Sequence, residues 1–578
     1  MLQPSRSAAV SIAAVAAVYV ATLCLLEKRG FWVVDNANKF LQVQAIIGGG
    51  YREYSLPWPG AKLDPQFQFN PLPSPFSAVR NGKLYSIFPP FFAAASTLPY
   101  RAFGVWGLYV LPAVCGVVML AGLARLAGLL GFGPPARHAA VLVAGLCTPV
   151  WFYSVTFWEH VPAVCLCVWA VCGYVRFLRG GSLRHLIAGS AAAAFGVYFR
   201  DELYLFCLVL LAAALLYARG RRTKAALAAL GAMAVSIVPL WLFQWQALGS
   251  PFGFHLGTHA LGAGGLLEHL AARPMAAYML FAAAGSSVGL SVVLAAPFLA
   301  GFLINPRLPR RAHGVVVPLA CLAAVASAAL ALKGYYTPGS PIEWMLLSNS
   351  LFTGAPVLIL AFLGLKRPPQ AGGTGWLSKW VWGLALGYAV VYALATPGRP
   401  TTGVHWGNRF LLVLYPLLGL LAGANLLEAL GSFKQLARRP VAAVALVVLV
   451  SLAAQANSIR LLAKKKQVSF RLNEAIRKRP EGAVISRVWW APQEMFSCFY
   501  TKSMFFAPTP EDYGVLLGRL SLAGYRRHLF VDGPFAQPRP RSVARLPDDG
   551  LGAYSLEFLV GEVPPPASPN GGAVRRQE

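Results

Sequence analysis

The sequence is poor in charged residues, and acidic residues are the scarcer kind. Only 12% of its 578 residues are charged, whereas soluble globular domains have about 25%. With 57% hydrophobic residues and a mean hydropathy of +0.56, the composition excludes an ordinary soluble enzyme and predicts an α-helical polytopic membrane protein. The net charge of +29 does not indicate a nucleic acid partner, because Lys and Arg occur in short runs between apolar segments, a pattern that orients membrane helices.

Several common motifs are also missing. There is no internal repeat, no GxGxxG, no Walker loop and no heptad pattern, so nothing indicates a nucleotide-binding fold or a coiled coil. Of nine cysteines only Cys498 lies in a polar region, which argues against a disulfide framework. The first apolar segment is followed by "EKRGFW", which offers no small-residue cleavage site, so we interpret it as an uncleaved first helix rather than a signal peptide.

Long apolar segments dominate what is present. A membrane span needs about 20 such residues, and by that measure the sequence predicts about thirteen spans: 8–26, 105–126, 138–155, 160–178, 184–199, 202–218, 225–246, 287–304, 313–332, 350–366, 379–396, 409–428 and 441–457. Residues 84–104 are apolar but are broken by Pro89, Pro90 and Pro99, so we expect a helix lying at the membrane interface there.

The distribution of basic residues predicts the orientation of these spans. With the N-terminus in the cytoplasm, the cytoplasmic connections hold Arg125, Arg137, Arg176, Arg179, Arg184, Arg219, Arg221, Arg222, Lys224, Arg307, Arg310, Arg311, Lys366, Arg367, Lys379, Lys434, Arg438 and Arg439. The short outer connections hold only Arg200, Arg273, Lys333, Arg399 and Arg409. This asymmetry follows the positive-inside rule and predicts a multi-pass protein of the cytoplasmic (inner) membrane, with the long first loop outside.

The sequence after the last predicted span is polar. In it "GAVISRVWW" and "YRRHLFVDG" indicate strands, and Thr509, Pro510, Glu511 and Asp512 indicate the start of a helix between them. We therefore predict a transmembrane domain at 1–457, whose long first outer loop at 27–104 contains interfacial helices. A small extracytoplasmic α/β domain at 458–562 and a disordered tail at 563–578 follow.

The outer connections carry most of the residues that could do chemistry. These are Asp35, Asn36, Lys83 and Tyr85 in the first; Glu159 and His160 in the second; Arg200, Asp201 and Glu202 in the third; His255 and His259 in the fourth; and Arg399, His405, Asn408 and Arg409 in the sixth. Together they predict a cavity at the outer leaflet that suits a substrate with a lipid tail and a phosphate head. Arg and Lys would hold the phosphate, and a carboxylate would take a proton from an incoming hydroxyl.

Each group also has a purely structural interpretation. Asp35 could be solvated by lipid head groups, Glu159 could pair with Arg200 or Arg409, and residues 200–202 could form a local ion network. His255 and His259 are four residues apart, a spacing that suits metal ligands on one helical face. The glycines around them argue against a helix, so metal binding is left open.

The order of these features resembles that of the GT-C superfamily of membrane glycosyltransferases. An acid soon after the first span, a long outer loop with a Pro-Pro interfacial helix ending in "FG", and a second acid between the third and fourth spans carry the resemblance. The layout is similar to that of bacterial members akin to protein O-mannosyltransferases and the aminoarabinose transferase of lipid A. "HWGNRFLLVLYPLLGLL" is similar to the start of a late helix in many bacterial members.

The resemblance implies an inverting transfer of a sugar from a polyprenyl-phosphate donor on the outer face of the membrane. In it, Asp35 stands where the acid that activates the acceptor stands, Glu159 is the second acid, and Arg200 lies near the family's basic residue after the fifth span. It also places His255 or His259 near a loop that supplies a metal ligand in some relatives. The usual Asp-Glu pair is Asp35-Asn36 here, which leaves one carboxylate as the general base.

These features lead to one set of expected site residues. The expected catalytic residues are Asp35, as the general base, and Glu159, which would orient the acceptor or join in metal binding. Arg200 and Arg409 would neutralise the leaving phosphate, and a divalent metal remains an open question. The expected substrate-binding residues are Asn36, Lys83, Tyr85, His160, Arg200, Glu202, His405 and Arg409. The partners would be a polyprenyl-phosphate sugar, membrane lipid, and a glycan, lipid or protein acceptor.

Two other classes of protein compete with this interpretation. A secondary transporter or lipid flippase places ionisable residues near mid-bilayer, but the spans here are nearly free of charge at their centres. An O-antigen ligase or polymerase usually carries its long outer loop between late spans, whereas here the loop follows the first.

In "VWWAPQE" we expect Trp489 and Trp490 to belong to a strand.

Overall fold

The computed structural model describes residues 6–217, 222–253, 266–281, 349–366, 375–396, 405–433, 438–533, 542–545 and 556–565. By their contacts the residues form two compact units. The membrane unit comprises Met1–Leu26 and Leu98–Ala463, and the loop unit comprises Glu27–Thr97 and Lys464–Glu578. The first outer loop thus groups with the C-terminal part of the chain.

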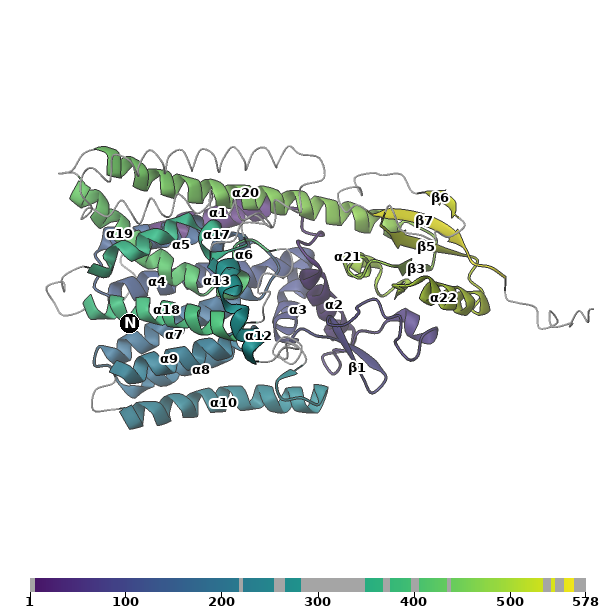
Figure 1. Ribbon diagram of the computed structural model, residues 1–578, viewed down its shortest axis with the longest axis horizontal. Coiled ribbons are helices and arrows are strands. Elements are labelled where there is room, and N and C mark those ends of the chain that lie inside the picture. Colours follow the sequence, from purple (N-terminus) through teal and green to yellow (C-terminus); the bar gives the residue numbers. More distant parts are fainter. Residues whose placement is uncertain are drawn as a thin grey trace, which may run out of the picture. The chain divides into compact units, whose positions relative to one another are not determined.

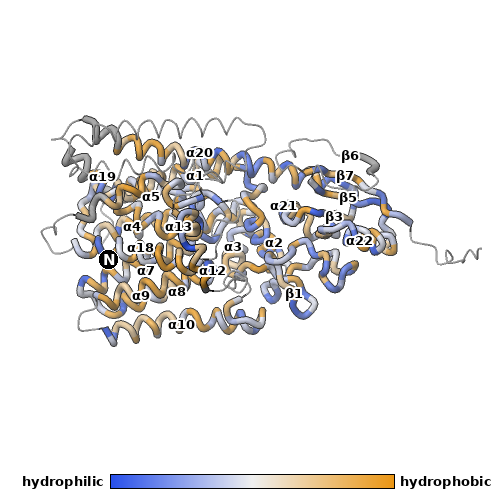
Figure 2. The backbone as a smooth tube through the Cα atoms, in the orientation of Figure 1, coloured by the Kyte–Doolittle hydropathy of each residue, from blue (hydrophilic) through white to orange (hydrophobic). Residues whose placement is uncertain are grey.

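The membrane unit is a bundle of apolar helices, seen as the orange helices in Figure 2. Its elements include α1 (Arg6–Leu25), α4 (Val110–Leu129), α5 (Pro134–Leu146), α6 (Val150–Ser154), α7 (His160–Leu178), α8 (Leu183–Gly196), α9 (Leu203–Tyr217), α10 (Arg222–Leu248), α12 (Leu266–Ala271), α13 (Arg273–Phe281), α17 (Leu351–Gly354), η3 (Pro356–Lys366), α18 (Gly375–Ala395), η4 (Arg409–Leu411) and α19 (Leu414–Phe433). In Figure 1, α7, α8 and α9 lie side by side. α20 (Arg438–Arg477) begins in this unit and continues into the loop unit.

Within the described residues, six helical segments are long and apolar enough to cross a membrane: Ala8–Leu25, Phe91–Leu129, His160–Leu178, Arg222–Leu248, Gly375–Ala395 and Val444–Arg477. The chain is therefore a multi-pass membrane protein. The predicted spans 287–304 and 313–332 lie outside the described residues, so the total of thirteen stays a prediction. α3 (Phe91–Phe103) occupies the segment predicted to be interfacial, and it is followed by η2 (Gly104–Tyr109) and α4.

Prolines interrupt two of the predicted spans. The segment 138–155 is divided into α5 and α6 before Pro149, and the segment 350–366 is a short α-helix followed by a 3-10 helix that starts at Pro356. Proline lacks the backbone N–H that continues a helical ladder, which is why neither segment is one continuous helix. The last predicted span, 441–457, is part of a longer helix, because α20 continues to Arg477.

Small residues set the spacing of the helices in the membrane unit. A Cβ on Gly423 of α19 would lie 2.6 Å from the backbone N of Ala140 in α5, and one on Gly173 of α7 would lie 2.6 Å from the carbonyl O of His185 in α8. Close backbone approach of this kind is the usual way that helices associate in lipid. The close packing of α7 on α8 fixes the turn before α7 and the turn after α8, and these two turns carry residues of the candidate site.

The first helix of the loop unit is α2 (Val34–Gly48), whose position the sequence did not reveal. It is followed by η1 (Pro59–Lys62) and a hairpin of β1 (Ser77–Arg80) and β2 (Lys83–Ser86). Asn81 and Gly82 both have positive φ, as a two-residue hairpin turn requires. The C-terminal part adds β3 (Ala483–Ser486), α21 (Ala491–Glu494), η5 (Phe496–Cys498), β4 (Ser503–Phe506), α22 (Pro510–Leu522), β5 (Arg527–Asp532), β6 (Ser542–Arg545) and β7 (Glu557–Glu562).

The five C-terminal strands form one sheet in the order β4-β3-β5-β7-β6. β3 is parallel to β4 and β5, and β7 is antiparallel to β5 and β6. The predicted helix start is confirmed, because the Thr509 side chain accepts from the backbone N of Asp512 and caps α22. The prediction for Trp489 and Trp490 was wrong: β3 ends at Ser486, whose Oγ accepts from the backbone N of Val488, and both Trp residues lie in the turn before α21.

Segments of the first loop are bound to the sheet within the loop unit. Trp58 Nε1 donates to the Met504 carbonyl at 2.8 Å, and the backbone N of Phe506 donates to the Phe69 carbonyl at 3.0 Å. Arg519 of α22 donates to the fully buried Asp64 carboxylate at 2.9 Å. These contacts explain why residues 27–97 and the C-terminal strands form one compact unit.

A buried histidine makes the stability of this sheet depend on pH. His528 of β5 is 0% exposed, and burial lowers its pKa to about 4 from the ordinary 6.5. The unfolded chain protonates His528 below pH 6.5, whereas the folded sheet does so only near pH 4. The contribution of the neutral His528 to the free energy of unfolding is therefore fully present above pH 6.5. It should fall by about 3 kcal/mol between pH 6.5 and 4.

Hydrogen exchange of the β5 amides in the detergent-solubilised full-length protein, corrected for intrinsic rates, measures this loss. Replacement of His528 by Gln should flatten the pH dependence. An equally steep dependence in His528→Gln would assign the loss to another group.

Candidate functional site

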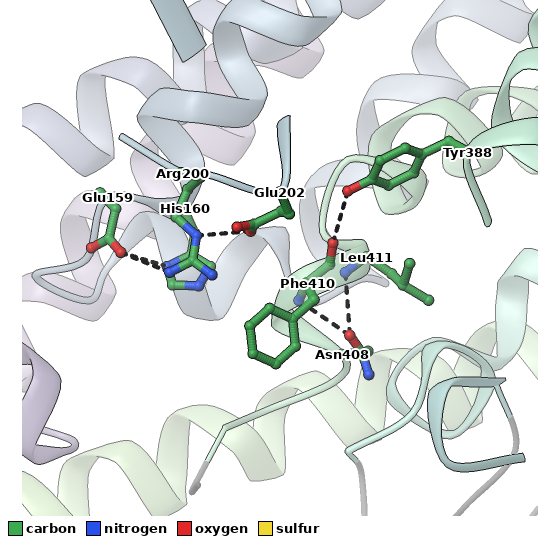
Figure 3. A network of polar contacts seen from close by, with 8 residues as sticks. All are labelled: Glu159, His160, Arg200, Glu202, Tyr388, Asn408, Phe410 and Leu411. Carbon is green, nitrogen blue, oxygen red and sulfur yellow. Dashed lines mark hydrogen bonds and ion pairs between the residues drawn. The ribbon is translucent and has the colours of Figure 1, made fainter. Parts of the chain in front are cut away.

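Two acids and an arginine form a buried ion network in the membrane unit (Figure 3). Arg200 Nη1 donates to Glu159 Oε1 at 3.0 Å, and Arg200 Nε donates to Glu202 Oε1 at 2.7 Å. The side chains of Glu159, Arg200 and Glu202 are 3%, 6% and 10% exposed. One guanidinium is thus shared by two carboxylates.

Two turns of the bundle bring these residues together. Glu159 is the last residue before α7 begins at His160, and Arg200 lies in the connection between α8 and α9. Because α7 packs along α8, the two turns are neighbours at the same end of the bundle. His160 lies beside the network, with Nδ1 3.9 Å from Glu159 Oε1, and its ring is flanked by Tyr153 and Trp158.

A second arginine, Arg409, is the first residue of η4, shortly before α19. The Arg409 guanidinium lies 5.4 Å from the Trp158 ring centre and 4.9 Å from that of Phe410, while the Arg200 guanidinium lies 5.6 Å from the Phe410 ring centre. Phe410 therefore contacts both cations, an arrangement that holds guanidinium groups without neutralising them.

The backbone around Arg409 is firmly held. Asn408 Oδ1 accepts from the backbone N of Phe410 and of Leu411, and the Tyr388 hydroxyl donates to the Phe410 carbonyl at 3.2 Å. His405 does not line the pocket described next; its Nδ1 is 2.6 Å from the Gly407 carbonyl, and its ring packs on Phe410. His405 therefore supports the loop that presents Arg409.

A small, narrow pocket lies beside these residues. Its polar wall is formed by His160, Arg200, Glu202 and Arg409, and its apolar wall by Ala163, Val164, Leu203, Tyr388, Phe410, Leu412 and Val413. Within the part of the chain that the structure describes, Arg200 Nη2 is buried and makes no hydrogen bond. The pocket thus combines an available guanidinium N–H with an apolar wall, which suits an anionic head group attached to a hydrocarbon chain.

Asp35 and Asn36 lie in the loop unit, in the first turn of α2. Asp35 is 8% exposed and Asn36 is fully buried, with Asn36 Oδ1 accepting from the backbone N of Val33. Asn36 therefore caps the helix, and Asp35 is the ionisable group of this turn.

The C-terminal segment holds α2 through buried contacts inside the loop unit. Asn38 Nδ2 donates to Gln493 Oε1 at 2.8 Å, and the Tyr500 hydroxyl donates to the Leu41 carbonyl at 2.7 Å. The rings of Phe31, Phe40 and Phe496 pack together with centroid distances of 4.7 to 5.9 Å. Gln493 is a residue that sequence reasoning missed, and nothing in its surroundings signals its contact with a helix over 400 residues earlier.

The other expected residues are elsewhere. Lys83 and Tyr85 belong to the β1–β2 hairpin, where Lys83 forms an ion pair with Glu53 and Tyr85 packs on Tyr54. Neither lines the pocket. His255 and His259 lie outside the described residues, and no cluster of three or more His, Cys, Asp or Glu side chains that could hold a metal ion is found among the residues that are described.

Comparison with known proteins gives a likeness in fold. No protein-family model and no curated protein sequence matches this chain. The structure of ArnT from Cupriavidus metallidurans bound to undecaprenyl phosphate is similar over 96% of this chain and 97% of its own, with a TM-score of 0.52 and 13% identity, and its apo form is similar to the same degree. The oligosaccharyltransferase AglB from Archaeoglobus fulgidus reaches a TM-score of 0.49 at 13% identity, covering 92% of this chain and 70% of AglB. The expected likeness is thus confirmed at the level of the fold, by the similarity to ArnT.

Proposed function

We propose that this protein is an inverting membrane glycosyltransferase, which moves a sugar from a polyprenyl-phosphate donor to an acceptor hydroxyl at the outer face of the cytoplasmic membrane. The observation that carries the proposal is the likeness to ArnT over almost the whole of both chains, in a structure that holds undecaprenyl phosphate. The positive-inside pattern supports an outer location for the first loop and the C-terminal domain.

The pocket of the membrane unit is the proposed donor site. Arg200 and Arg409 bind the phosphate, since guanidinium groups form charge-assisted hydrogen bonds to phosphate oxygens. The apolar wall at Ala163, Val164 and Leu203 takes the first part of the lipid chain. Glu159 and Glu202 hold Arg200 in position from either side.

In the proposed reaction Asp35 accepts the proton of the acceptor hydroxyl as its oxygen attacks the anomeric carbon. The bond between that carbon and the phosphate oxygen breaks, and polyprenyl phosphate leaves with the electron pair. Attack opposite the leaving group inverts the anomeric carbon. Arg200 and Arg409 stabilise the charge that develops on the phosphate.

A divalent metal is not given a step in this proposal. Glu202 and His160 line the donor pocket and Glu159 lies beside His160, but the Arg200 guanidinium already pairs with both acids, where a metal cation would be repelled. We therefore assign Glu159 to positioning Arg200. His255 and His259 remain candidate ligands by sequence alone.

Deletion of the gene tests the proposal. Cells without the protein should lose one sugar residue from an envelope glycan, lipid or protein and should accumulate the corresponding polyprenyl-phosphate sugar. Mass spectrometry of envelope glycans and of the lipid extract measures both changes, and the wild-type gene should reverse them. A lipid-linked sugar that accumulates on the cytoplasmic side, with no transferase activity in the purified protein, would support a flippase instead.

A further inference from the structure

The sheet of the loop unit has a feature that the proposed donor site does not use. β3, β4 and β5 are parallel, and β3, the first of them in the chain, lies between the other two. The chain therefore leaves β3 toward β4 on one side and later returns on the other side as β5. In open sheets of this kind, ligands bind outside the carboxyl ends of the strands at the point where the order reverses, here between β3 and β5.

An ion pair marks that point. Arg487 directly follows β3, and Asp532 is the last residue of β5. Arg487 Nη1 lies 3.3 Å from Asp532 Oδ2, with side chains 14% and 12% exposed, and the backbone N of Arg487 donates to the Val531 carbonyl at 3.1 Å. The pair presents donors and acceptors with no net charge at the edge of the sheet.

An exposed tryptophan follows two residues later in the same turn. Trp489 is 44% exposed although its ring stacks on Phe76 of the first loop, with centroids 5.0 Å apart and planes 11° from parallel. Its carbonyl accepts from Gln493 Nε2 at 3.1 Å. The indole is thus held in one orientation and remains accessible.

We propose that the carboxyl edge of β3 and β5 binds a sugar ring of a glycan, and that this glycan is the acceptor. An accessible indole matches the C–H face of a pyranose, and an adjacent carboxylate and guanidinium match its hydroxyl groups as acceptor and donor. Because the Arg487–Asp532 pair is neutral overall, an uncharged sugar fits it better than a phosphate. The role of this glycan as the acceptor rests on the proposed function, whereas the binding of a glycan at this edge does not.

Binding of oligosaccharides to the full-length protein in detergent tests this site directly. The probes are neutral oligosaccharides released from the envelope of the producing cells by mild acid, and saturation-transfer NMR with titration measures their binding. Wild-type protein should bind at least one of them, Trp489→Ala and Asp532→Asn should weaken binding at least tenfold, and Trp489→Phe should retain part of it. The melting temperature of Trp489→Ala should stay at the wild-type value.

Trp106 gives a matched control, because it is 45% exposed and belongs to the membrane unit. Trp106→Ala should bind as the wild type does. Absence of binding to every oligosaccharide would overturn the proposal, and so would an equal loss of binding in Trp489→Ala and Trp106→Ala. Binding of peptides at Trp489 instead of oligosaccharides would point to a protein acceptor and would also overturn it. The proposed transferase activity would survive these outcomes, since deletion of the gene tests it separately.

Discussion

Replacing Asp35 by Asn is expected to lower the rate of sugar transfer by about 10²- to 10⁴-fold, the usual contribution of a positioned general base. Asn has nearly the same shape as Asp, and position 35 is already followed by Asn36 and Asn38 in the same helix, so α2 should form as before. The variant loses only the proton acceptor. Single-turnover transfer in membranes that contain the lipid-linked donor measures the rate.

Asp64→Asn is the matched control for this prediction. Asp64 is a fully buried acid of the same unit, and it pairs with Arg519 rather than belonging to the proposed site. Its replacement should lower the melting temperature and leave the transfer rate per folded molecule unchanged. Equal transfer by Asp35→Asn and wild type would refute Asp35 as the base, while equal losses in both variants would indicate disruption of the loop unit.

The sequence predicted long apolar helices well and failed where distant contacts decide the structure. α7, α8, α9, α10 and α18 lie within a few residues of the predicted spans because burial in lipid needs only length and hydropathy. α2 was missed because its polar residues suggest a solvated loop, although Asn36, Asn38 and Gln42 are all fully buried. Asn38 is compensated by Gln493 and Gln42 by the Phe88 carbonyl, and neither partner can be found by local pattern.

The same distinction applies to the candidate site. Orientation by the positive-inside rule placed Glu159, Arg200 and Arg409 at one end of the bundle, and the structure brings Glu159 and Arg200 into contact, with Arg200 and Arg409 lining one pocket. Lys83 and Tyr85 were grouped with the site by their position in the first loop alone. In the structure Lys83 pairs with Glu53 and Tyr85 packs on Tyr54, which belong to a segment outside the hairpin that no local pattern indicates.

Arg200→Gln is expected to have the second large effect, on both folding and donor binding. Removal of the guanidinium leaves Glu159 and Glu202 buried without their shared cation. Breaking a buried ion pair in this way costs about 3–5 kcal/mol. The melting temperature of the purified protein should fall, and binding of undecaprenyl phosphate, measured by native mass spectrometry, should be lost.

Loss of binding in that variant alone would not separate a phosphate ligand from a structural arginine, so the acids must be neutralised as well. In the triple variant Glu159→Gln, Arg200→Gln, Glu202→Gln, no buried charge of the network remains, and replacing a buried ion network by neutral groups of similar size is often close to neutral for stability. The melting temperature should therefore return toward the wild-type value. If Arg200 binds the phosphate, the triple variant should fold and still fail to bind undecaprenyl phosphate. Wild-type binding by a stable triple variant would instead assign the network to folding alone and leave Arg409 as the remaining candidate for the phosphate.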